Sequence, residues 1–316
     1  MKKFNTLLII GKIPPPTGGV TIHVKRIIDK LEKENFNYHF EYLELKNILN
    51  LIKYFFLNKN VHLHTSNAYI QFILSFLSVI FNKFLIITLH SEFKQHKSKV
   101  KNKLENIALR LAAIPVVLNL KSYDLIKSLN NNTILDTAYI KPKIQIELPI
   151  NIINIINKKK QTFNKIFCTN AYNMVFDINK KDLYGIHDLI HLFEGSKYFL
   201  FICDPSGSYN DYYKEFSFKN IYFITFSIDF ISLLIKTDGF IRNTTTDGDS
   251  ISIHEALFNN VNVFCTNVVD RPLNTILYNN AKKELLDLLD QSHNLLLNKS
   301  DVKENKIFTI YNNLNK

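Results

Sequence analysis

Two carboxylates eight positions apart carry the strongest chemical signal in this sequence. Asp247 and Glu255 flank a Gly/Ser-rich turn that opens into a helix-forming stretch, Asp-Gly-Asp-Ser-Ile-Ser-Ile-His-Glu. A helix that begins in such a turn points several backbone N–H groups at one spot, and its dipole adds partial positive charge there. We therefore expect this segment to bind a ligand that carries both hydroxyl and phosphate groups, such as a sugar nucleotide.

A second glycine-bearing loop precedes another expected helix. Residues 11–19 read Gly-Lys-Ile-Pro-Pro-Pro-Thr-Gly-Gly, so Gly18 and Gly19 stand directly before the helix. Paired glycines at this position let backbone approach a phosphate closely. The loop matches neither a P-loop nor the dinucleotide-binding fingerprint. A plain connection between a strand and a helix remains the alternative.

Histidines give a third, weaker signal. His90 follows the apolar run 84–89, at the edge where active sites form in parallel sheets. A neutral imidazole there can bind a sugar hydroxyl or a developing charge, although a histidine at a strand end is more often structural. The pairs His62-x-His64 and His187-x3-His191 imitate metal sites. Neither pair has a convincing third ligand, so we expect no metal ion and no cofactor.

A run of lysines follows His90 with no acid between them. The run lies in the basic half of the chain, since Lys and Arg outnumber Asp and Glu 22 to 10 in residues 1–158, whereas residues 159–316 are nearly balanced. Nucleic-acid binding would add base-stacking and base-reading residues. Here the aromatic segment 54–56 lies in an amphipathic stretch beside lysines, which favours an anionic membrane surface over nucleic acid, and a solvated helix face remains the alternative. The lysines are Lys94, Lys97, Lys99, Lys101 and Lys103.

Strand-like and helix-like runs must position these residues, and they alternate along both halves. This alternation predicts an α/β fold with doubly wound parallel sheets, in which both glycine-bearing loops open at the carboxyl edge. The expected strands are 4–10, 39–43, 61–65, 84–89, 114–118, 165–168, 198–203, 221–225, 239–242 and 262–265. The expected helices are 20–34, 48–57, 68–81, 100–112, 122–130, 185–193, 230–235, 252–258 and 281–297.

An Asn-rich passage after Pro149, which ends in three lysines at 158–160, is the expected linker between domains 1–158 and 159–316. The terminal helix 281–297 is a candidate to pack back across the domain junction. Three isolated cysteines, a very short N-terminal apolar run at 7–10, and no stretch of about 20 apolar residues indicate a cytoplasmic protein without a signal peptide or spanning helix.

Taken together, these motifs resemble the retaining GT-B glycosyltransferases of the family 4 type. The Glu-x7-Glu motif of that family stands here as Asp247 to Glu255. Its Lys-Gly helix start corresponds to Tyr184-Gly185, and its following apolar strand corresponds to residues 262–267. The resemblance implies two Rossmann-like domains, with an N-terminal domain on the acceptor and membrane side and a C-terminal donor domain.

The resemblance also implies roles for individual residues. Asp247 and His90 would contact the transferred sugar, and Glu255 would hold the donor ribose. Helix dipoles and basic side chains would neutralise the leaving diphosphate without a metal. The implied donor-binding residues are Gly18, Gly19, Gly248, Asp249, Ser250, Ile251, Ser252 and Glu255.

Two cations of the family pattern are missing from this chain. The positions of the usual Arg and Lys hold Asn170 and Tyr184. Arg242, at the end of the strand before the motif, is the candidate catalytic replacement.

We therefore expect a retaining transferase that moves a sugar from a nucleotide sugar to a lipid-linked, cell-surface glycan at the inner face of the cytoplasmic membrane, in polysaccharide, O-antigen or capsule biosynthesis. Two alternatives stay open. One is a catalytically weak nucleotide-sugar-binding partner subunit, and the other is a GT-B nucleotide-sugar epimerase. We do not expect nucleic acid as a partner.

Overall fold

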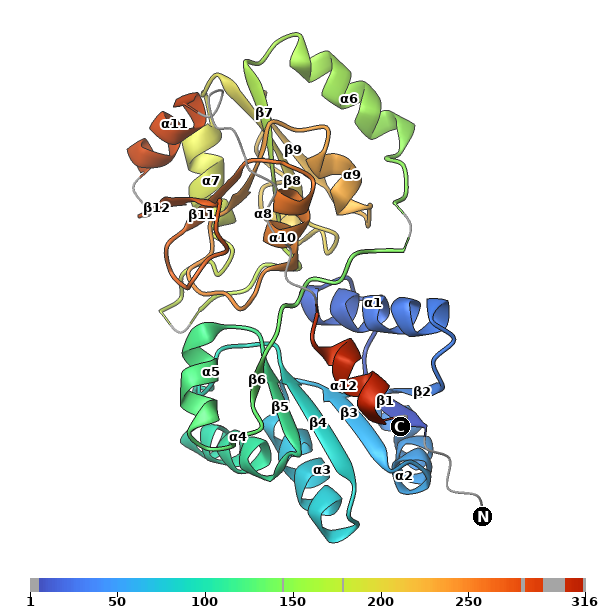
Figure 1. Cartoon of the computed structure of the whole chain (residues 1–316). Coiled ribbons are helices and arrows are strands. Elements are labelled where there is room, and N and C mark those ends of the chain that lie inside the picture. The colour runs from blue at the N-terminus through green and yellow to red at the C-terminus, as the bar shows by residue number, and fades with distance from the viewer. Residues whose placement is uncertain (1–5, 144, 178, 280–281, 292–304, 315–316) are drawn as a thin grey trace. The chain divides into compact units, whose positions relative to one another are not determined.

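The computed structural model describes residues 6–143, 145–177, 179–279, 282–291 and 305–314. The chain forms two compact units, one of Met1–Lys143 with Lys303–Lys316 and the other of Ile144–Val302. Each unit is built on a six-stranded parallel sheet with helices on both faces (Figure 1). The α/β fold with two doubly wound parallel sheets, predicted from the alternation of strands and helices, is confirmed.

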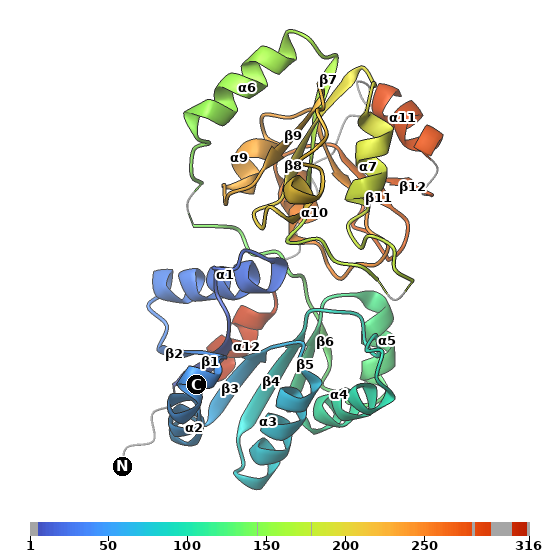
Figure 2. The same cartoon turned by 180° about the vertical axis from the view of Figure 1, so that it is seen from behind.

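The first unit has the strand order β2-β1-β3-β4-β5-β6. One face of its sheet packs against α2, α3, α4 and α5 through apolar side chains, and α1 and α12 cover the opposite face (Figure 2). The strands are β1 (Leu7–Gly11), β2 (Tyr38–Tyr42), β3 (Asn60–His64), β4 (Phe84–Leu89), β5 (Ile114–Val117) and β6 (Ile134–Leu135). The helices are α1 (Gly19–Lys33), α2 (Ile48–Leu57), α3 (Ala68–Ile80), α4 (Lys99–Leu111), α5 (Leu120–Lys127) and α12 (Ile307–Leu314), with a 3-10 turn at Leu45–Asn47.

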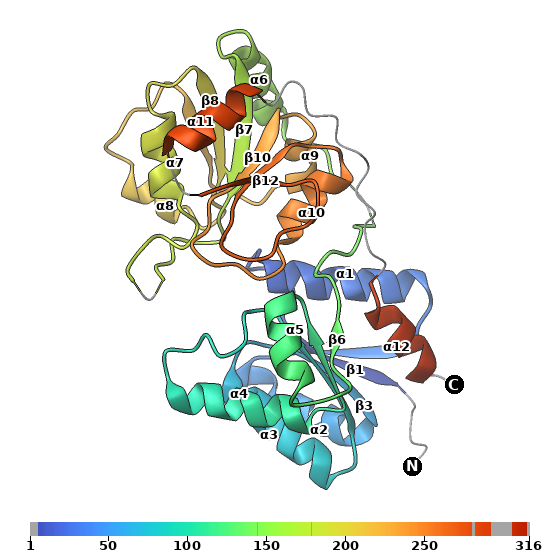
Figure 3. The same ribbon diagram turned by 60° about the vertical axis from the view of Figure 1, so that its left-hand side comes forward.

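The second unit has the strand order β12-β11-β10-β7-β8-β9. Its two apolar cores lie on opposite faces of the sheet, one under α6, α9 and α10 and the other under α7, α8 and α11 (Figure 3). The strands are β7 (Lys165–Asn170), β8 (Tyr198–Cys203), β9 (Ile221–Ile224), β10 (Gly239–Arg242), β11 (Val263–Thr266) and β12 (Ile276–Tyr278). The helices are α6 (Ile150–Lys160), α7 (Ile186–Phe193), α8 (Ser208–Tyr212), α9 (Phe230–Leu234), α10 (Ile251–Phe258) and α11 (Lys282–Gln291).

The strand register lines up the residues that can do chemistry. In the first unit His64 pairs with Thr88, two positions before His90. In the second unit Arg242 pairs with Cys265, and the neighbouring strand β7 ends at Asn170. Because all these strands are parallel, their carboxyl ends meet at one edge of each sheet. Each unit therefore gathers its polar strand-end residues at a single edge.

The predicted linker was wrong. Residues 150–160 form α6, whose Ile152 and Ile156 are fully buried in a core of the second unit. Isoleucines four positions apart lie on one helix face, and their burial outweighs the low helix propensity of the intervening asparagines. The division between the units falls at Lys143 and Ile144, before α6, and not at residue 158.

The C-terminal part of the chain also differs from expectation. Within the predicted helix 281–297 the structure has α11, whose Leu285 and Leu289 pack into the second unit, and residues 292–297 lie outside the described residues. The segment that belongs to the first unit is α12, which was not predicted. Its Tyr311 hydroxyl lies 2.5 Å from Nδ1 of His62 on β3.

The cysteines and the lengths of the helices were also predicted from the sequence. All three cysteines are buried and free, as expected, and burial raises the pKa of the Cys168 thiol to about 12. None of the described helices is long and apolar enough to cross a bilayer.

Candidate functional site

Asp247, in the loop after β10, is the centre of a charged cluster in the second unit. Arg242 binds its carboxylate in a bidentate manner, with Nε 2.9 Å from Oδ2 and Nη2 3.1 Å from Oδ1. Arg271 adds a third contact, with Nη1 2.9 Å from Oδ2. The Gly248 N–H donates to Oδ1 at 3.1 Å. Since a carboxylate offers about four lone-pair sites, Asp247 is fully engaged by the protein.

The electrostatics of this cluster favour an anion. Burial alone would raise the pKa of the Asp247 carboxyl, but the Arg242 and Arg271 guanidiniums outweigh burial and hold that pKa below its usual value. Asp247 is therefore ionised at neutral pH. Two guanidiniums around one carboxylate leave one net positive charge on this cluster of three residues.

Arg271 was missed in the sequence. It lies in the loop after β11, and its Nε donates to the Thr266 carbonyl at 3.1 Å while its Nη2 donates to the Thr244 hydroxyl at 3.1 Å. Only the fold brings it to Asp247, 24 positions earlier in the chain, and no local motif marks it. The chain thus has a second cation beside Arg242.

Asn170 and Tyr184, at the positions where the resemblance predicts two cations, both contact Arg242. The Asn170 side-chain oxygen lies 3.3 Å from Nη1 of Arg242, and its amide nitrogen donates to the Ser252 hydroxyl at 2.6 Å. The Tyr184 ring lies under the guanidinium, with its centre 5.3 Å from the central carbon. These two positions therefore orient a cation, although neither supplies one.

The predicted phosphate cradle is the start of α10. Ser250 is its N-cap in an extended conformation, and its side chain makes no capping bond. The Gly248 N–H is occupied by Asp247, so the donors aimed past the helix end are those of the first turn, which includes Ile251 and Ser252. Asp249 pairs with His254 across that turn. Glu255, one turn into the helix, is buried.

Gly185 fixes the start of α7 against the end of β10. It has a left-handed φ of 61°, and a Cβ at this position would lie 2.2 Å from the Asn243 carbonyl oxygen. The Asn243 amide donates to the Gly185 carbonyl at 2.9 Å and accepts from the Tyr278 hydroxyl at 2.6 Å. Only glycine fits here, because both the backbone conformation and the close approach exclude a side chain.

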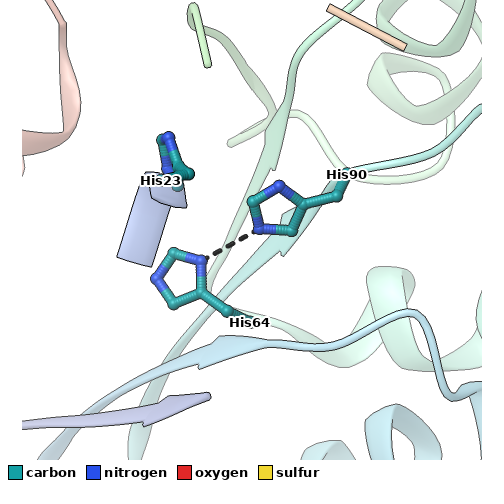
Figure 4. Close-up of side chains that lie close together, drawn as sticks. All are labelled: His23, His64 and His90. Carbon is teal, nitrogen blue, oxygen red and sulfur yellow. Dashed lines mark hydrogen bonds between the residues drawn. The ribbon is translucent and has the colours of Figure 1, made fainter. Parts of the chain in front are cut away.

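In the first unit, His90 belongs to a cluster with His23 and His64 (Figure 4). His64 Nδ1 lies 3.1 Å from His90 Nε2, and His23 Nδ1 lies 2.7 Å from the Ala138 carbonyl oxygen. Burial lowers the pKa of His64 and of His90 well below the usual value, so both imidazoles are neutral at neutral pH. His90 itself is half-buried.

The two predicted metal look-alikes have other partners in the structure. His62 and His64 lie on the same face of β3, with ring centres 4.0 Å apart, but the His62 nitrogens are engaged elsewhere, Nδ1 by the Tyr311 hydroxyl and Nε2 by the Thr88 hydroxyl at 2.7 Å. His187 Nδ1 lies 2.7 Å from the Tyr213 hydroxyl. Among the described residues, His23, His64 and His90 form the one group of potential ligands close enough to hold a metal ion.

The proline-containing loop, residues 11–18, ends at the N-terminus of α1, where the side chain of Thr21 caps the helix. The Gly18 N–H donates to the Thr21 hydroxyl at 3.0 Å, and that hydroxyl donates to the Pro16 carbonyl at 2.7 Å. A Cβ placed on Gly19 would meet nothing within 4 Å. Packing inside the protein therefore does not require glycine at position 19.

No protein-family model and no curated protein sequence matches the chain. Solved structures do. HepE of Anabaena in complex with UDP-glucose aligns with a TM-score of 0.67 at 14% identity, over 90% of this chain and 89% of that chain. Sucrose-phosphate synthase of Thermosynechococcus elongatus aligns at 0.66 and 12%, over 90% and 89%. WaaG, a glycosyltransferase involved in lipopolysaccharide biosynthesis, aligns at 0.61 and 12%, over 90% of each chain.

These proteins are GT-B glycosyltransferases, and their two parallel sheets with interleaved helices match those described above. This chain has the GT-B fold. The GT-B architecture expected from the resemblance is thus confirmed, whereas identities of 14% or less carry no assignment of individual residues.

The surface predicted to meet a membrane lies in the N-terminal GT-B unit and differs in detail from expectation. All five lysines of the 94–103 run are exposed, as expected. Of the aromatic segment 54–56, however, Phe55 is buried, Tyr54 stacks on His39 with ring centres 3.6 Å apart, and only Phe56 is exposed. Exposed apolar side chains lie along both α2 and α3. On α2 they are Ile48, Leu49, Ile52 and Phe56, and on α3 they include Tyr69, Ile73, Phe76, Val79 and Ile80.

Proposed function

We propose that the chain is a retaining glycosyltransferase that moves a sugar from a nucleotide-sugar donor to a glycan acceptor. The observation that carries this proposal is the cluster of Arg242, Asp247 and Arg271 at the carboxyl edge of the second unit. It places net positive charge in a GT-B donor unit, where a nucleoside diphosphate needs it. HepE, whose structure is similar at the level of the fold, binds UDP and UDP-glucose.

In the proposed reaction, the leaving diphosphate takes up negative charge as the bond from the anomeric carbon to the phosphate oxygen breaks. Arg242, Arg271 and the first-turn N–H groups of α10 stabilise that charge, because they are fixed before the reaction begins. Their charge replaces that of a metal ion at the donor. Asp247, whose oxygens are occupied by the guanidiniums, acts as a positioning residue, and Glu255 holds the ribose.

Retention of configuration follows from attack on the same face of the sugar that the diphosphate leaves. The acceptor hydroxyl oxygen bonds to the anomeric carbon, and its proton passes to the departing phosphate oxygen. The products are the glycoside and the nucleoside diphosphate. His90 and the backbone at Gly18 and Gly19 are proposed to contact the donor from the N-terminal unit, with the neutral His90 imidazole at the sugar.

The acceptor is proposed to be a lipid-linked, cell-surface glycan, reached at the inner face of the cytoplasmic membrane. The support is that exposed apolar and basic side chains of α2, α3 and α4 contact one another on the first unit. The rings of Phe56 on α2 and Phe81 after α3 lie 4.8 Å apart, and Lys101 of α4 lies over Tyr69 of α3 at 5.8 Å. An apolar stripe flanked by lysines suits the interface of an anionic bilayer.

The proposal is tested by measuring nucleotide-sugar binding and transfer for the wild type, Arg271→Ala and Arg242→Ala. Wild-type protein should bind one member of a nucleotide-sugar panel and release the free diphosphate with an acceptor. Each alanine variant should bind at least about 10-fold more weakly, because a hydrogen bond to a charged group contributes about 1.5–3 kcal/mol. Arg271→Lys keeps the positive charge but loses the planar guanidinium. Its affinity for the nucleotide sugar should therefore lie between the affinities of the wild type and Arg271→Ala.

Arg110→Ala, which removes an exposed arginine of α4, is the matched control and should bind like the wild type. Thermal melting checks that each variant is folded. If no nucleotide sugar binds, or if both alanine variants bind normally while folded, the proposal is wrong.

The two alternatives are separated in the same assay. A weak partner subunit was suggested by the absence of two cations, and Arg271 supplies one of them. An epimerase would release an isomerised sugar without needing an acceptor, whereas a transferase makes a new glycoside.

A further inference from the structure

Three histidines from separate parts of the chain converge at the carboxyl edge of the first sheet. His23 lies on α1, His64 ends β3, and His90 follows β4. Each ring offers one nitrogen, and the three nitrogens lie within 4.8 Å of one another. Figure 4 shows that the three rings surround a common space. Such convergence of imidazoles is the arrangement that proteins use to bind a transition metal.

The spacing fits a tetrahedral ion. At zinc–nitrogen distances of about 2.0–2.1 Å, ligand nitrogens lie roughly 3.3 Å apart and ring centres roughly 5 Å apart. The His64 and His90 nitrogens are 3.1 Å apart. The ring centres are 5.1 Å apart for His23 and His90, 5.4 Å for His64 and His90, and 5.6 Å for His23 and His64. Small rotations of the side chains bring all three nitrogens to one ion.

The hydrogen bonds around the cluster favour metal binding as well. The Ala138 carbonyl can only accept, so His23 Nδ1 carries the proton and its Nε2 carries the lone pair. A backbone carbonyl behind the ring fixes metal-binding histidines in this way. His64 is 2% exposed, so an ion held by its ring would be largely shielded from water.

We propose that His23, His64 and His90 bind one divalent transition-metal ion, with Zn²⁺ as the best fit. Imidazole ligands suit zinc and disfavour Mg²⁺ and Ca²⁺, which prefer oxygen. Three protein ligands leave the fourth tetrahedral position open to water or to a ligand oxygen.

One consequence rests on the proposed function. His90 is also proposed to contact the transferred sugar, and an ion bound to the same imidazole competes with that contact. Bound zinc therefore inhibits sugar transfer, and removing it with a chelator restores transfer.

The experiment titrates Zn²⁺ into the metal-free full chain by calorimetry and repeats the titration with Co²⁺, read by its visible absorption. Wild-type protein should bind one ion per chain, with the absorption of tetrahedral cobalt. His23→Gln, His64→Gln and His90→Gln should each weaken binding by at least about 100-fold, since changes outside the ligand set already cost 10–100-fold. His191→Gln, which removes an exposed histidine of α7, is the matched control and should leave binding unchanged.

Absence of saturable zinc binding overturns the proposal, as does binding that survives in folded variants of the cluster. If His64→Gln fails to fold, because that side chain is buried, His90→Gln at the half-buried position decides the outcome. No donor or acceptor is present in these titrations, so their outcome is independent of the outcome of the transfer assay. Transfer measured in chelator likewise tests the proposed function without zinc.

Discussion

At the scale of single residues, the Asp247 carboxylate binds two cationic side chains, those of Arg242 and Arg271. The resemblance to the GT-B family implies that Asp247 contacts hydroxyls of the transferred sugar. In the structure its oxygens are occupied by Arg242, Arg271 and the Gly248 N–H. The residue type was recognised from sequence, whereas its partners depended on which loops the sheet brings together.

Asp247→Asn should lower the free energy of unfolding at pH 7 by about 3 kcal/mol, because it leaves two largely buried guanidiniums without their counter-charge. The folded-state pKa of Asp247 is below its ordinary value, so the stability it provides is present above about pH 4 and is lost as the pH falls through the lower folded-state pKa. The difference between wild type and variant should thus shrink below about pH 4. Urea unfolding at several pH values checks both points, and equal stability at pH 7 would refute them.

Replacing each of two glycines by alanine should affect different properties, stability at Gly185 and donor binding at Gly19. Gly185→Ala should destabilise the protein by about 2 kcal/mol or more, because a left-handed φ and contact with Asn243 both exclude a Cβ. Gly19→Ala should leave the melting temperature unchanged, since open space surrounds that position, yet should weaken donor binding if backbone there approaches the phosphates. Melting curves and calorimetry with a nucleotide sugar distinguish the two. Normal donor binding by Gly19→Ala would remove Gly19 from the site.

At the scale of elements, hydropathy patterns predicted most strands and helices because each buries an apolar stripe. Strands β4, β8 and β10 and helix α2 have the expected bounds. The errors have physical causes. Helix α6 was hidden by asparagines and lysines, although Ile152 and Ile156 show the four-residue spacing that buries it. The convergence of His23, His64 and His90 could not be predicted, because 67 positions separate the outer two and no local pattern links them.

The exposed stripe on α3 leads to a prediction about membranes. Phe76→Ser should reduce flotation with anionic vesicles by removing an apolar side chain that is half-exposed, and Lys99→Gln with Lys101→Gln and Lys103→Gln should reduce it further at low salt. Wild-type flotation should weaken as salt screens the lysines. Leu273→Ser, which removes an exposed leucine of the second unit, is the control and should float like the wild type. Equal flotation with neutral vesicles would contradict the role of the lysines.

At the scale of the whole molecule, the first unit is built from two distant stretches of chain. Besides the contact between Tyr311 and His62, the Asp136 carboxylate accepts from the N–H of Lys306 at 2.9 Å and from the N–H of Ile307 at 3.0 Å. Ile307 and Phe308 are buried. The returning segment is thus a part of the core of the first unit.

Tyr311→Phe should destabilise the first unit by about 1–3 kcal/mol, because it leaves the buried Nδ1 of His62 without a partner. Hydrogen exchange should quicken at the amides of β3 and β4 and stay unchanged in β7 and β8. Tyr212→Phe, at an exposed tyrosine of the second unit, serves as the control. Uniform loss of protection in both units would contradict the assignment of α12 to the first.

The order of elements along the chain has a consequence for synthesis on the ribosome. Between Lys143 and Lys303 the whole second unit must be translated before the segment that bears Tyr311 exists. At about 5–20 residues per second, that interval lasts roughly 10–30 s. During this time the nascent first sheet has emerged with His62 and its neighbours still lacking their final cover. The unit that is translated first is therefore the last to be completed.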